Sequence, residues 1–375
     1  MTTHVANISY LTDIRFGAGA LQCLPDVMDT LSMTRPLVVT DAVLRDLGFV
    51  DRLGIDSAAV FDGVPTNPTE ASVMQGVALF RQAGCNGVIA LGGGSPIDCG
   101  KCVALLASHD PTLGRYAFIR GGVDRITADQ PPVIAIPTTA GTGAEVGRAA
   151  LITLDSHEKL AIISPHIIPN IAICDPTLTL ALPPRLTAAT GMDAITHCVE
   201  TFCSPRVNPV ADAIALDGLA RAAKHIRRAV NDGTDLTARS GMMMAALQGG
   251  LTFQKGLGVV HSLSHPLGTL ADKQLHHGML NAIFLPHATR FNMSACADRM
   301  QIIRQTLGLT AADDLPDWFT SLTTDLQLPT CLRDMQATRD DLTCMADLAM
   351  QDHCNATNPR PVTIDDVHAL YDAAM

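Results

Sequence analysis

A chain of 375 residues is long enough to build two domains with separate cores, and it carries a formal net charge of −11. The acidic balance and the lack of a basic run in the sequence exclude nucleic acid and anionic membrane surfaces as expected partners. No apolar run reaches the roughly 18–20 residues that span a bilayer, and the first ten residues lack the charged and apolar regions of a signal peptide.

The first half of the chain alternates short apolar runs with helical segments. Strand-like runs are predicted at 7–16, 36–40, 57–61, 87–91 and 132–136, and helices at 20–31 and 70–83. This alternation is typical of parallel βαβ units. Further strand-like runs follow at 148–153, 160–163 and 171–174. We therefore expect residues 1–181 to form an α/β domain with a parallel sheet.

The second half loses the strand pattern at about residue 182. Long helical runs are predicted at 186–202, 208–230 and 236–253, and more helices from about residue 295. Residues 182–375 are therefore expected to form an all-α domain.

A glycine run at 92–94 directly follows one predicted strand. Ser95 would cap the next helix, Pro96 suits its first position, and Asp98 completes a Ser-x-x-acid box. Glycines let a ligand approach the backbone, and a helix N-terminus offers free amides, so this turn suits a pyrophosphate. An ordinary strand-to-helix turn remains the alternative, because the run is not the GxGxxG fingerprint.

A second polar loop, PTTAGTG at 137–143, follows another predicted strand. In a parallel sheet both loops lie at the carboxyl edge, where ligands bind. The hydroxyls of Thr138, Thr139 and Thr142 would suit a phosphate or a ribose, unless the loop is simply solvated. Asp41, at the end of an earlier strand, would accept from a ribose hydroxyl and favour NAD over NADP, or would cap a helix.

Histidines cluster between residues 259 and 287, which hold five of the thirteen in the chain. His261 and His265 are four residues apart, and so are Asp193 and His197 upstream; this spacing places each pair on one face of a helix. A set of imidazoles with one carboxylate suits Fe(II) or Zn(II). The eleven cysteines are odd in number and several lie in apolar runs, which favours buried thiols in a reducing cytoplasm.

Four segments together resemble the iron-containing alcohol dehydrogenase family, which includes lactaldehyde reductases and 1,3-propanediol dehydrogenases. They are GGGSPIDCGK, PTTAGTGAEV, LPPRLTAATGMDAITHCVE and HSLSHPLG with HHGMLNAIFLPH, within a match from about residue 13 to 290. The resemblance implies the dehydroquinate synthase-like fold: an N-terminal α/β domain for NAD(P), a C-terminal helical domain and a cleft between them.

The resemblance also implies a role for individual residues. The metal ligands would be Asp193, His197, His261 and His277. His265 would lie near the nicotinamide and is the candidate catalytic residue, for a proton relay or for orientation. The cofactor contacts would be Asp41, Asn67, Gly93, Gly94, Ser95, Asp98, Thr138, Thr139, Thr142 and Lys159. For Lys159 the alternative is an ordinary surface lysine, and His287 is expected to be structural.

The sequence departs from the family pattern in three places. The segment between His265 and His277 is two residues longer than usual, and His276 is adjacent; we choose His277 because it keeps the family's ten-residue spacing to His287. Gly100 replaces a more usual alanine, which lowers helix propensity. After Val146, where the family often has a threonine, this chain has Gly147 and Arg148. Arg148 would favour an anionic substrate, unless it is a surface arginine.

These observations predict a metal-dependent, NAD-linked alcohol dehydrogenase or aldehyde reductase, with Fe(II) or alternatively Zn(II), and with NADP less expected than NAD. Small or apolar candidate lining residues at 149–151, Phe253 and Leu257 suit a short alcohol or aldehyde. A homodimer or larger homo-oligomer in the cytoplasm is expected.

Two other functions share the fold. One is a metal-independent reductase like the maleylacetate reductases, against which Asp193 and His197 argue. The other is a metal lyase like dehydroquinate synthase, which would need a cluster of Lys and Arg around the ligands; the helical half of the sequence shows none.

Overall fold

The computed structural model describes residues 8–375 except 157, 271–272, 274 and 311. The chain divides into two compact units. A sheet unit comprises Tyr10–Thr139 and Gly143–Leu180, and a helical unit comprises Ala181–Met375 with Ala140–Thr142 and residues 8–9. The few residues from the loop after Thr139 therefore belong with the helices.

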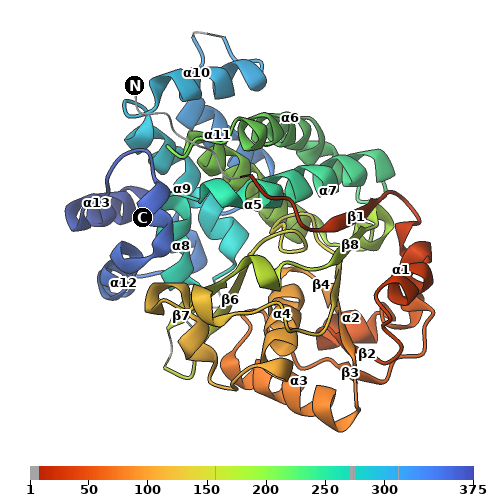
Figure 1. Ribbon diagram of the computed structural model, residues 1–375. Coiled ribbons are helices and arrows are strands. Elements are labelled where there is room, and N and C mark those ends of the chain that lie inside the picture. The colour runs from red at the N-terminus through yellow and green to blue at the C-terminus, as the bar shows by residue number, and fades with distance from the viewer. Residues whose placement is uncertain (1–7, 157, 271–272, 274, 311) are drawn as a thin grey trace. The chain divides into compact units, whose positions relative to one another are not determined.

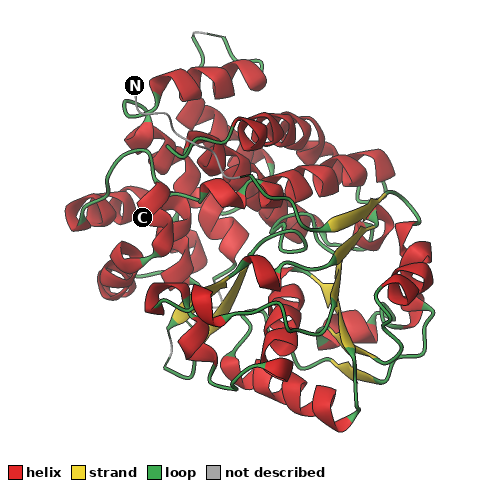
Figure 2. Ribbon diagram, in the orientation of Figure 1, coloured by secondary structure: helices red, strands yellow, loops and turns green. Residues whose placement is uncertain are grey.

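The sheet unit is built on a six-stranded sheet whose paired strands all run parallel (Figures 1 and 2). Its strand order is β1-β8-β5-β4-β2-β3. The strands are β1 (Asp13–Phe16), β2 (Pro36–Val39), β3 (Ala59–Phe61), β4 (Gly87–Gly92), β5 (Val133–Pro137) and β8 (Ile171–Cys174). The helices are α1 (Leu24–Thr30), α2 (Ala42–Asp46), α3 (Glu70–Gln82) and α4 (Gly94–Ser108). The predicted parallel α/β architecture is confirmed.

The strands of this sheet bury both faces. Along β4, Val88 joins one apolar cluster with residues of α3 and α4, whereas Ile89 and Leu91 join another with residues of α1. Alternating side chains point to opposite faces of a strand, so each face has its own core. This double burial explains why the predicted strands read as continuous apolar runs.

Helix α4 lies very close to the sheet. A Cβ at Gly100 would stand 2.8 Å from the Cβ of Ala90 on β4, closer than real side chains come. The glycine that lowers helix propensity therefore permits close packing. On the same helix Cys99 and Cys102 are buried, and burial raises the pKa of Cys99 to about 12, so both sulfurs remain protonated thiols.

Three details of the sheet unit differ from the sequence pattern. The strand predicted at 7–16 is only Asp13–Phe16, because its partner β8 is itself four residues long; residue 7 lies outside the described residues. The later runs form β6 (Ala149–Thr153) and β7 (Lys159–Ile163), which pair antiparallel in a separate two-stranded sheet. The helix predicted at 20–31 begins as a 3₁₀ turn, Ala20–Cys23, before α1.

The described part of the helical unit contains no strand, as predicted. Its core helix α5 is buried on almost every side. The helices are α5 (Pro184–Cys203), α6 (Pro209–Asn231), α7 (Leu236–Leu251), α8 (Val259–Leu267), α9 (His277–Asn292), α10 (Ala297–Thr306), α11 (Leu315–Asp325), α12 (Arg339–Gln351) and α13 (Ile364–Ala374).

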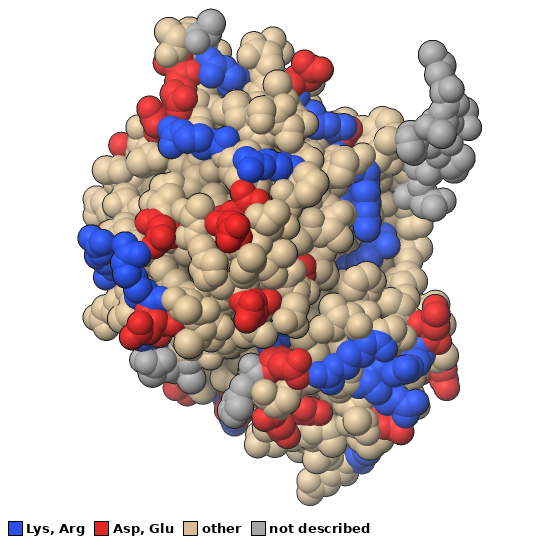
Figure 3. All heavy atoms as spheres, turned by 90° about the vertical axis from the view of Figure 1, so that its left-hand side faces the viewer, with Lys and Arg blue, Asp and Glu red and all other residues tan. Residues whose placement is uncertain are grey.

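The helices and one face of the surface can be compared with what a membrane or a nucleic acid would require. Within the described residues, no helix has both the length and the apolar character needed to cross a membrane. On the face drawn in Figure 3, Lys and Arg side chains are mixed with Asp and Glu between wide uncharged areas. That face offers no continuous basic surface of the kind that binds nucleic acid.

Candidate metal and dinucleotide sites

Helix α5 presents three acid or imidazole side chains on one face. Asp193, His197 and Glu200 follow each other at intervals of four and three residues, which places them in one row along a helix. All three are buried, with at most 6% of each residue exposed. Polar groups this deeply buried require partners, and two further helices provide them.

Helices α8 and α9 bring His261 and His277 to this row. The start of α9 lies almost on the backbone of α5, since a Cβ at Gly278 would stand 2.2 Å from the carbonyl oxygen of Ala189. Only glycine permits this approach, which carries the adjacent His277 toward Asp193.

The ring nitrogens of three histidines converge on one carboxylate oxygen. The Nε2 atoms of His197, His261 and His277 lie 3.4, 3.7 and 3.6 Å from Oδ1 of Asp193. A tetrahedral metal with bonds of about 2.1 Å holds its ligand atoms about 3.4 Å apart, so each of the three imidazoles stands at ligand spacing from Asp193. Ligand atoms of Asp193, His197 and His261 also all lie within 4.8 Å of one another. His276 instead occupies the N-cap position of α9. The geometry thus brings His277, rather than its neighbour, to the other predicted ligands.

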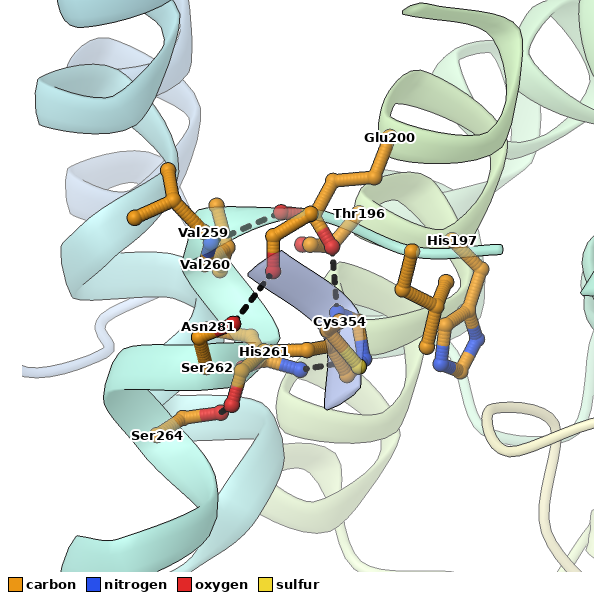
Figure 4. A network of polar contacts seen from close by, with 12 residues as sticks. Thr196, His197, Glu200, Val259, Val260, His261, Ser262, Ser264, Asn281 and Cys354 are labelled. Carbon is orange, nitrogen blue, oxygen red and sulfur yellow. Dashed lines mark hydrogen bonds and ion pairs between the residues drawn. The ribbon is translucent and has the colours of Figure 1, made fainter. Parts of the chain in front are cut away.

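Glu200 holds His261 from behind (Figure 4). Its Oε2 lies 2.6 Å from Nδ1 of His261, and its Oε1 accepts from the amide of Val260 at 2.7 Å. A carboxylate at Nδ1 fixes the tautomer that presents the Nε2 lone pair to a metal. Sequence reasoning missed Glu200, although its position three residues after His197 on the same helix face was a usable signal.

Asn281 is a second residue that sequence reasoning missed. It lies four residues after His277 on α9, so it shares that helix face. Its Nδ2 donates to Oδ1 of Asp193 at 2.8 Å, and it lies 3.1 Å from Nε2 of His277 and 3.3 Å from Nε2 of His261. The amide therefore faces the same point as the four predicted ligands.

The charges of this cluster suit a divalent cation. Burial opposes charge on Asp193, but the surrounding imidazoles lower the pKa of its carboxyl well below the usual range. Burial would also lower the pKa of His261, yet Glu200 and Asp193 outweigh it and raise that pKa to about 9; burial lowers the pKa of His197 to about 4. An imidazole that binds a metal must be neutral, so binding would displace the proton from His261. Asp193 and Glu200 then leave a charge of −2, which a divalent metal balances.

His265 does not join these four donors but has a carboxylate of its own. Its Nδ1 lies 2.9 Å from Oδ2 of Asp352, the residue that follows α12. Its ring stacks on those of His277 and His353, with centroids 5.4 and 6.1 Å apart. No sequence signal pointed to Asp352, which is 87 residues away along the chain.

The glycine turn of the sheet unit differs from its predicted capping. Helix α4 begins at Gly94 with Gly93 as its N-cap, and no side chain caps it. The predicted Ser95–Asp98 box is wrong: Ser95 donates to the carbonyl of Thr66, and Asp98 accepts from the amide of Leu151 at 3.0 Å. Because no side chain takes up the first amides of α4, they suit an anion.

The second predicted loop lies beside the first. The amide of Thr138 donates to the carbonyl of Gly92 at 3.0 Å, and a Cβ at Gly93 would stand 3.2 Å from Oγ1 of Thr139. Both loops follow neighbouring parallel strands, β4 and β5, at the same sheet edge. Thr142 is counted with the helical unit.

Three further predicted cofactor residues have defined contacts in the sheet unit. Asp41 is the N-cap of α2, and its Oδ1 accepts from the amide of Leu44 at 2.9 Å. This leaves its second oxygen for another donor. Lys159 donates from Nζ to Oδ1 of Asn67 at 3.0 Å, so these two residues lie together.

A buried ionic group lies behind this sheet edge. The fully buried Lys101 on α4 donates from Nζ to the carbonyls of Gly147 and Ala149, and lies 3.7 Å from Oδ1 of Asp98. Burial raises the pKa of the nearby Glu145 to about 7. Asp98 therefore serves this internal network in the structure, and its predicted cofactor contact stays a prediction.

The residues proposed to line a substrate pocket are spread over both units. The ring of Phe253 packs edge-on against His197, with centroids 4.7 Å apart, and the carbonyl of Leu257 accepts from Thr357. Arg148 is half-buried just before β6, and His287 is half-buried on α9.

Comparisons with known proteins cover the whole chain. A family described as iron-containing alcohol dehydrogenase matches residues 12–176, and its C-terminal domain family matches residues 187–375. The 4-hydroxybutyrate dehydrogenase of Cupriavidus necator is 47% identical, over 99% of this chain and all of that protein.

Solved structures agree with this match. A 1,3-propanediol oxidoreductase superposes with a TM-score of 0.91 at 35% identity, covering 99% of this chain and 100% of the other. The sulfoacetaldehyde reductase of Bifidobacterium kashiwanohense, solved with NAD⁺, has a TM-score of 0.89 at 28% identity and covers 99% and 98%.

Proposed function

This chain belongs to the iron-containing alcohol dehydrogenase family, and we propose that within it the protein is an Fe(II)- and NAD-dependent dehydrogenase of a short ω-hydroxy acid such as 4-hydroxybutyrate. The observation that carries the substrate proposal is the 47% identity to a 4-hydroxybutyrate dehydrogenase along the full length of both chains. Oxidation would give the corresponding ω-oxo acid and NADH.

The helical unit supplies the metal ligands in this proposal. Asp193, His197, His261 and His277 hold the ion, which as a Lewis acid would polarise the substrate oxygen. Glu200 keeps the Nε2 lone pair of His261 directed at the cluster, and Asn281 offers an amide beside it. His265, oriented by Asp352, orients the reacting groups or moves the substrate proton. The reaction itself is hydride transfer between the alcohol carbon and the nicotinamide.

The sheet unit holds the dinucleotide in this proposal. The amides at the start of α4 bind the pyrophosphate beside Gly93, Gly94 and Ser95, and the threonine loop adds hydroxyl donors. Asp41 binds the ribose through its second carboxylate oxygen and so favours NAD over NADP. Lys159 and Asn67, hydrogen-bonded to each other, act as one further contact.

Arg148 is the residue proposed to recognise the substrate carboxylate. An Arg side chain binds a carboxylate through paired, charged hydrogen bonds. Replacing it by alanine should raise the KM for 4-hydroxybutyrate about tenfold while leaving that for 1,3-propanediol within twofold, since a charged hydrogen bond contributes roughly 1.5–3 kcal/mol. Equal KM values for both substrates in the variant and the parent would remove this role.

The test of the whole proposal uses anaerobically purified protein. Bound iron, zinc, manganese and nickel are measured by mass spectrometry. NADH formation is followed with 4-hydroxybutyrate, 1,3-propanediol, ethanol and 1,2-propanediol, the alcohol that corresponds to lactaldehyde. We expect about one iron per chain and the highest kcat/KM with 4-hydroxybutyrate. A higher value with 1,3-propanediol would replace the substrate by the one named for the similar solved structure.

The two alternative functions are not favoured. A metal-independent reductase has no use for four donors at ligand spacing, and a lyase that only borrows NAD would show turnover without NADH accumulation. Loss of activity with a chelator, restored by Fe(II), excludes the first; steady NADH accumulation excludes the second.

We also propose that the chain works as a homo-oligomer in the cytoplasm. Strand β1 lies at the edge of the sheet, and Leu11, just before it, is 59% exposed. An edge strand with apolar side chains is a natural place for another chain to pair. Light scattering on the eluted protein should give at least twice the chain mass, and Leu11→Asp should lower it.

A further inference from the structure

A second group of metal-binding side chains lies within the described part of the helical unit. A ring nitrogen of His265, a carboxylate oxygen of Asp352 and Sγ of Cys354 all lie within 4.8 Å of one another. Nε2 of His353 lies 3.6 Å from the same sulfur. We propose that these four residues form a second, inhibitory site for a thiophilic divalent metal, with Zn(II) as its natural occupant.

The donor set suits zinc by type and by spacing. Two imidazoles, a carboxylate and a thiolate are all zinc ligands, whereas the Asp193 cluster contains no sulfur. In a tetrahedral zinc site the sulfur and nitrogen ligands lie about 3.6 Å apart, which is the separation of Cys354 and His353. The 2.9 Å between His265 and Asp352 is a hydrogen bond and would open by about 0.5 Å.

The chain presents this set on a short, constrained segment. Asp352, His353 and Cys354 are consecutive, where α12 gives way to a 3₁₀ turn, His353–Thr357. Oδ1 of Asp352 accepts from the amide of Cys354 at 2.9 Å, which fixes the turn. Cys354 is only 2% exposed, but the side chain of His353 is 22% exposed and gives the ion a route from solvent.

Binding exchanges protons in a balanced way. With no metal bound, His265 donates its Nδ1 proton to Asp352, and the buried Cys354 keeps its thiol proton. Zn(II) binds the thiolate and releases one proton to solvent. The imidazole proton moves from Nδ1 to Nε2, so His265 remains neutral while Nδ1 becomes a ligand.

Inhibition follows if His265 acts as proposed above, and this step rests on that proposed function. A metal at Nδ1 turns Nε2 from an acceptor into a donor and removes the His265–Asp352 hydrogen bond. The rings of His261 and His265 lie 5.6 Å apart, so ions in the two sites repel each other. The second site therefore fills only when metal exceeds one equivalent.

Cobalt(II) tests the site without any assay of activity. Co(II) bound to a thiolate absorbs in the near ultraviolet by sulfur-to-metal charge transfer, and Co(II) bound only by nitrogen and oxygen does not. The full-length chain should gain this band only after the first equivalent of Co(II). Asp193→Ala, in which the first site is removed, should gain it with the first equivalent. Because the band needs no turnover, it survives even if the proposed substrate is wrong.

Variants assign the sulfur. Cys354→Ser should lose the band, and Cys344→Ser, at an exposed cysteine on α12, should keep it. His353→Gln changes a partly exposed side chain, so we expect this variant to fold like the parent chain. Loss of a ligand should cost at least as much as loss of a residue that supports one, so this variant should bind cobalt at least about 10–100-fold more weakly. No band in the parent chain, or a band that persists in Cys354→Ser, overturns the site.

Zinc inhibition tests the consequence. Added Zn(II) should inhibit the iron-loaded enzyme, and His353→Gln should need about tenfold more zinc or beyond for half-inhibition relative to its own uninhibited rate. Half-inhibition at the same zinc concentration in parent and variant overturns the inhibitory role, whatever the cobalt spectra show.

Discussion

The sheet unit and the helical unit hold their candidate functional groups by different means. At the sheet edge the contacts offered to a dinucleotide are mainly backbone amides, glycines and short hydroxyl side chains after β4 and β5. In the helical unit the donors are side chains from three helices, and His261 is held from behind by Glu200. Removing one side chain should therefore weaken function only partly in the sheet unit, but should abolish metal binding or most of the activity in the helical unit.

The strongest test of this difference between the units is to remove the carboxylate that three histidines share in the helical unit. Asp193→Ala deletes the oxygen on which three Nε2 atoms converge, so bound iron should be lost. Without a Lewis acid worth several kcal/mol, kcat/KM should fall about 10³-fold or more. Metal analysis and the NADH assay measure both, and Asp217→Ala, at an exposed ion pair on α6, is the control. A variant that retains one iron per chain contradicts the assignment.

A smaller effect is expected one step behind the ligands. Glu200→Gln keeps an oxygen for the amide of Val260 but removes the charge that holds Nδ1 of His261. Metal affinity should drop about 10–100-fold, with the chain still folded. Competition against a chelator measures the affinity, and Glu158→Gln, in an exposed ion pair, is the control. Superimposable chelation curves for Glu200→Gln and the parent would mean that the carboxylate does not support the metal.

In the sheet unit we expect a change of preference rather than a loss. Asp41→Ser retains an oxygen that can cap α2 but removes the negative charge. The ratio of kcat/KM for NADP to that for NAD should rise about tenfold, because the repulsion of a 2′-phosphate disappears. Asp46→Ser, at an exposed position on the same helix, controls for general charge. An unchanged ratio would leave Asp41 with its capping role alone.

The last prediction concerns stability within the sheet unit. Burial raises the pKa of Glu145 from 4.5 to about 7. A raised pKa means that the folded state binds the extra proton, so this stabilisation is complete below pH 4.5 and is lost as the pH rises through 7. Relative to Glu145→Gln, the parent chain should lose about 3 kcal/mol of unfolding free energy across that window, at 1.36 kcal/mol per unit. Urea unfolding at pH 4.5, 6 and 8 measures it; parallel curves would mean that the carboxyl is already ionised.

Much of the architecture was predictable because its signals are local. Doubly buried parallel strands are continuous apolar runs, and four-residue spacing puts Asp193 and His197 on one helix face without knowledge of the fold. His277 was chosen over His276 from its spacing to His287, but the close approach at Gly278 that places it depends on how α9 meets α5. Asp352 was out of reach, since only tertiary packing brings it to His265. The capping box failed because Ser95 and Asp98 bond to distant backbone groups.

The regular geometry of helix α5 also restricts the spacing of the residues in the metal cluster. Asp193, His197 and Glu200 share one face because each residue of a helix turns the chain by about 100°. One residue inserted between Asp193 and Glu200 would rotate everything beyond it by that angle and move Glu200 off the helix face that carries Asp193. The connection from α8 to α9, at 268–276, carries no predicted ligand between its ends, so its length is free to vary. Related chains should therefore differ in length at this connection and keep the spacing within α5 unchanged.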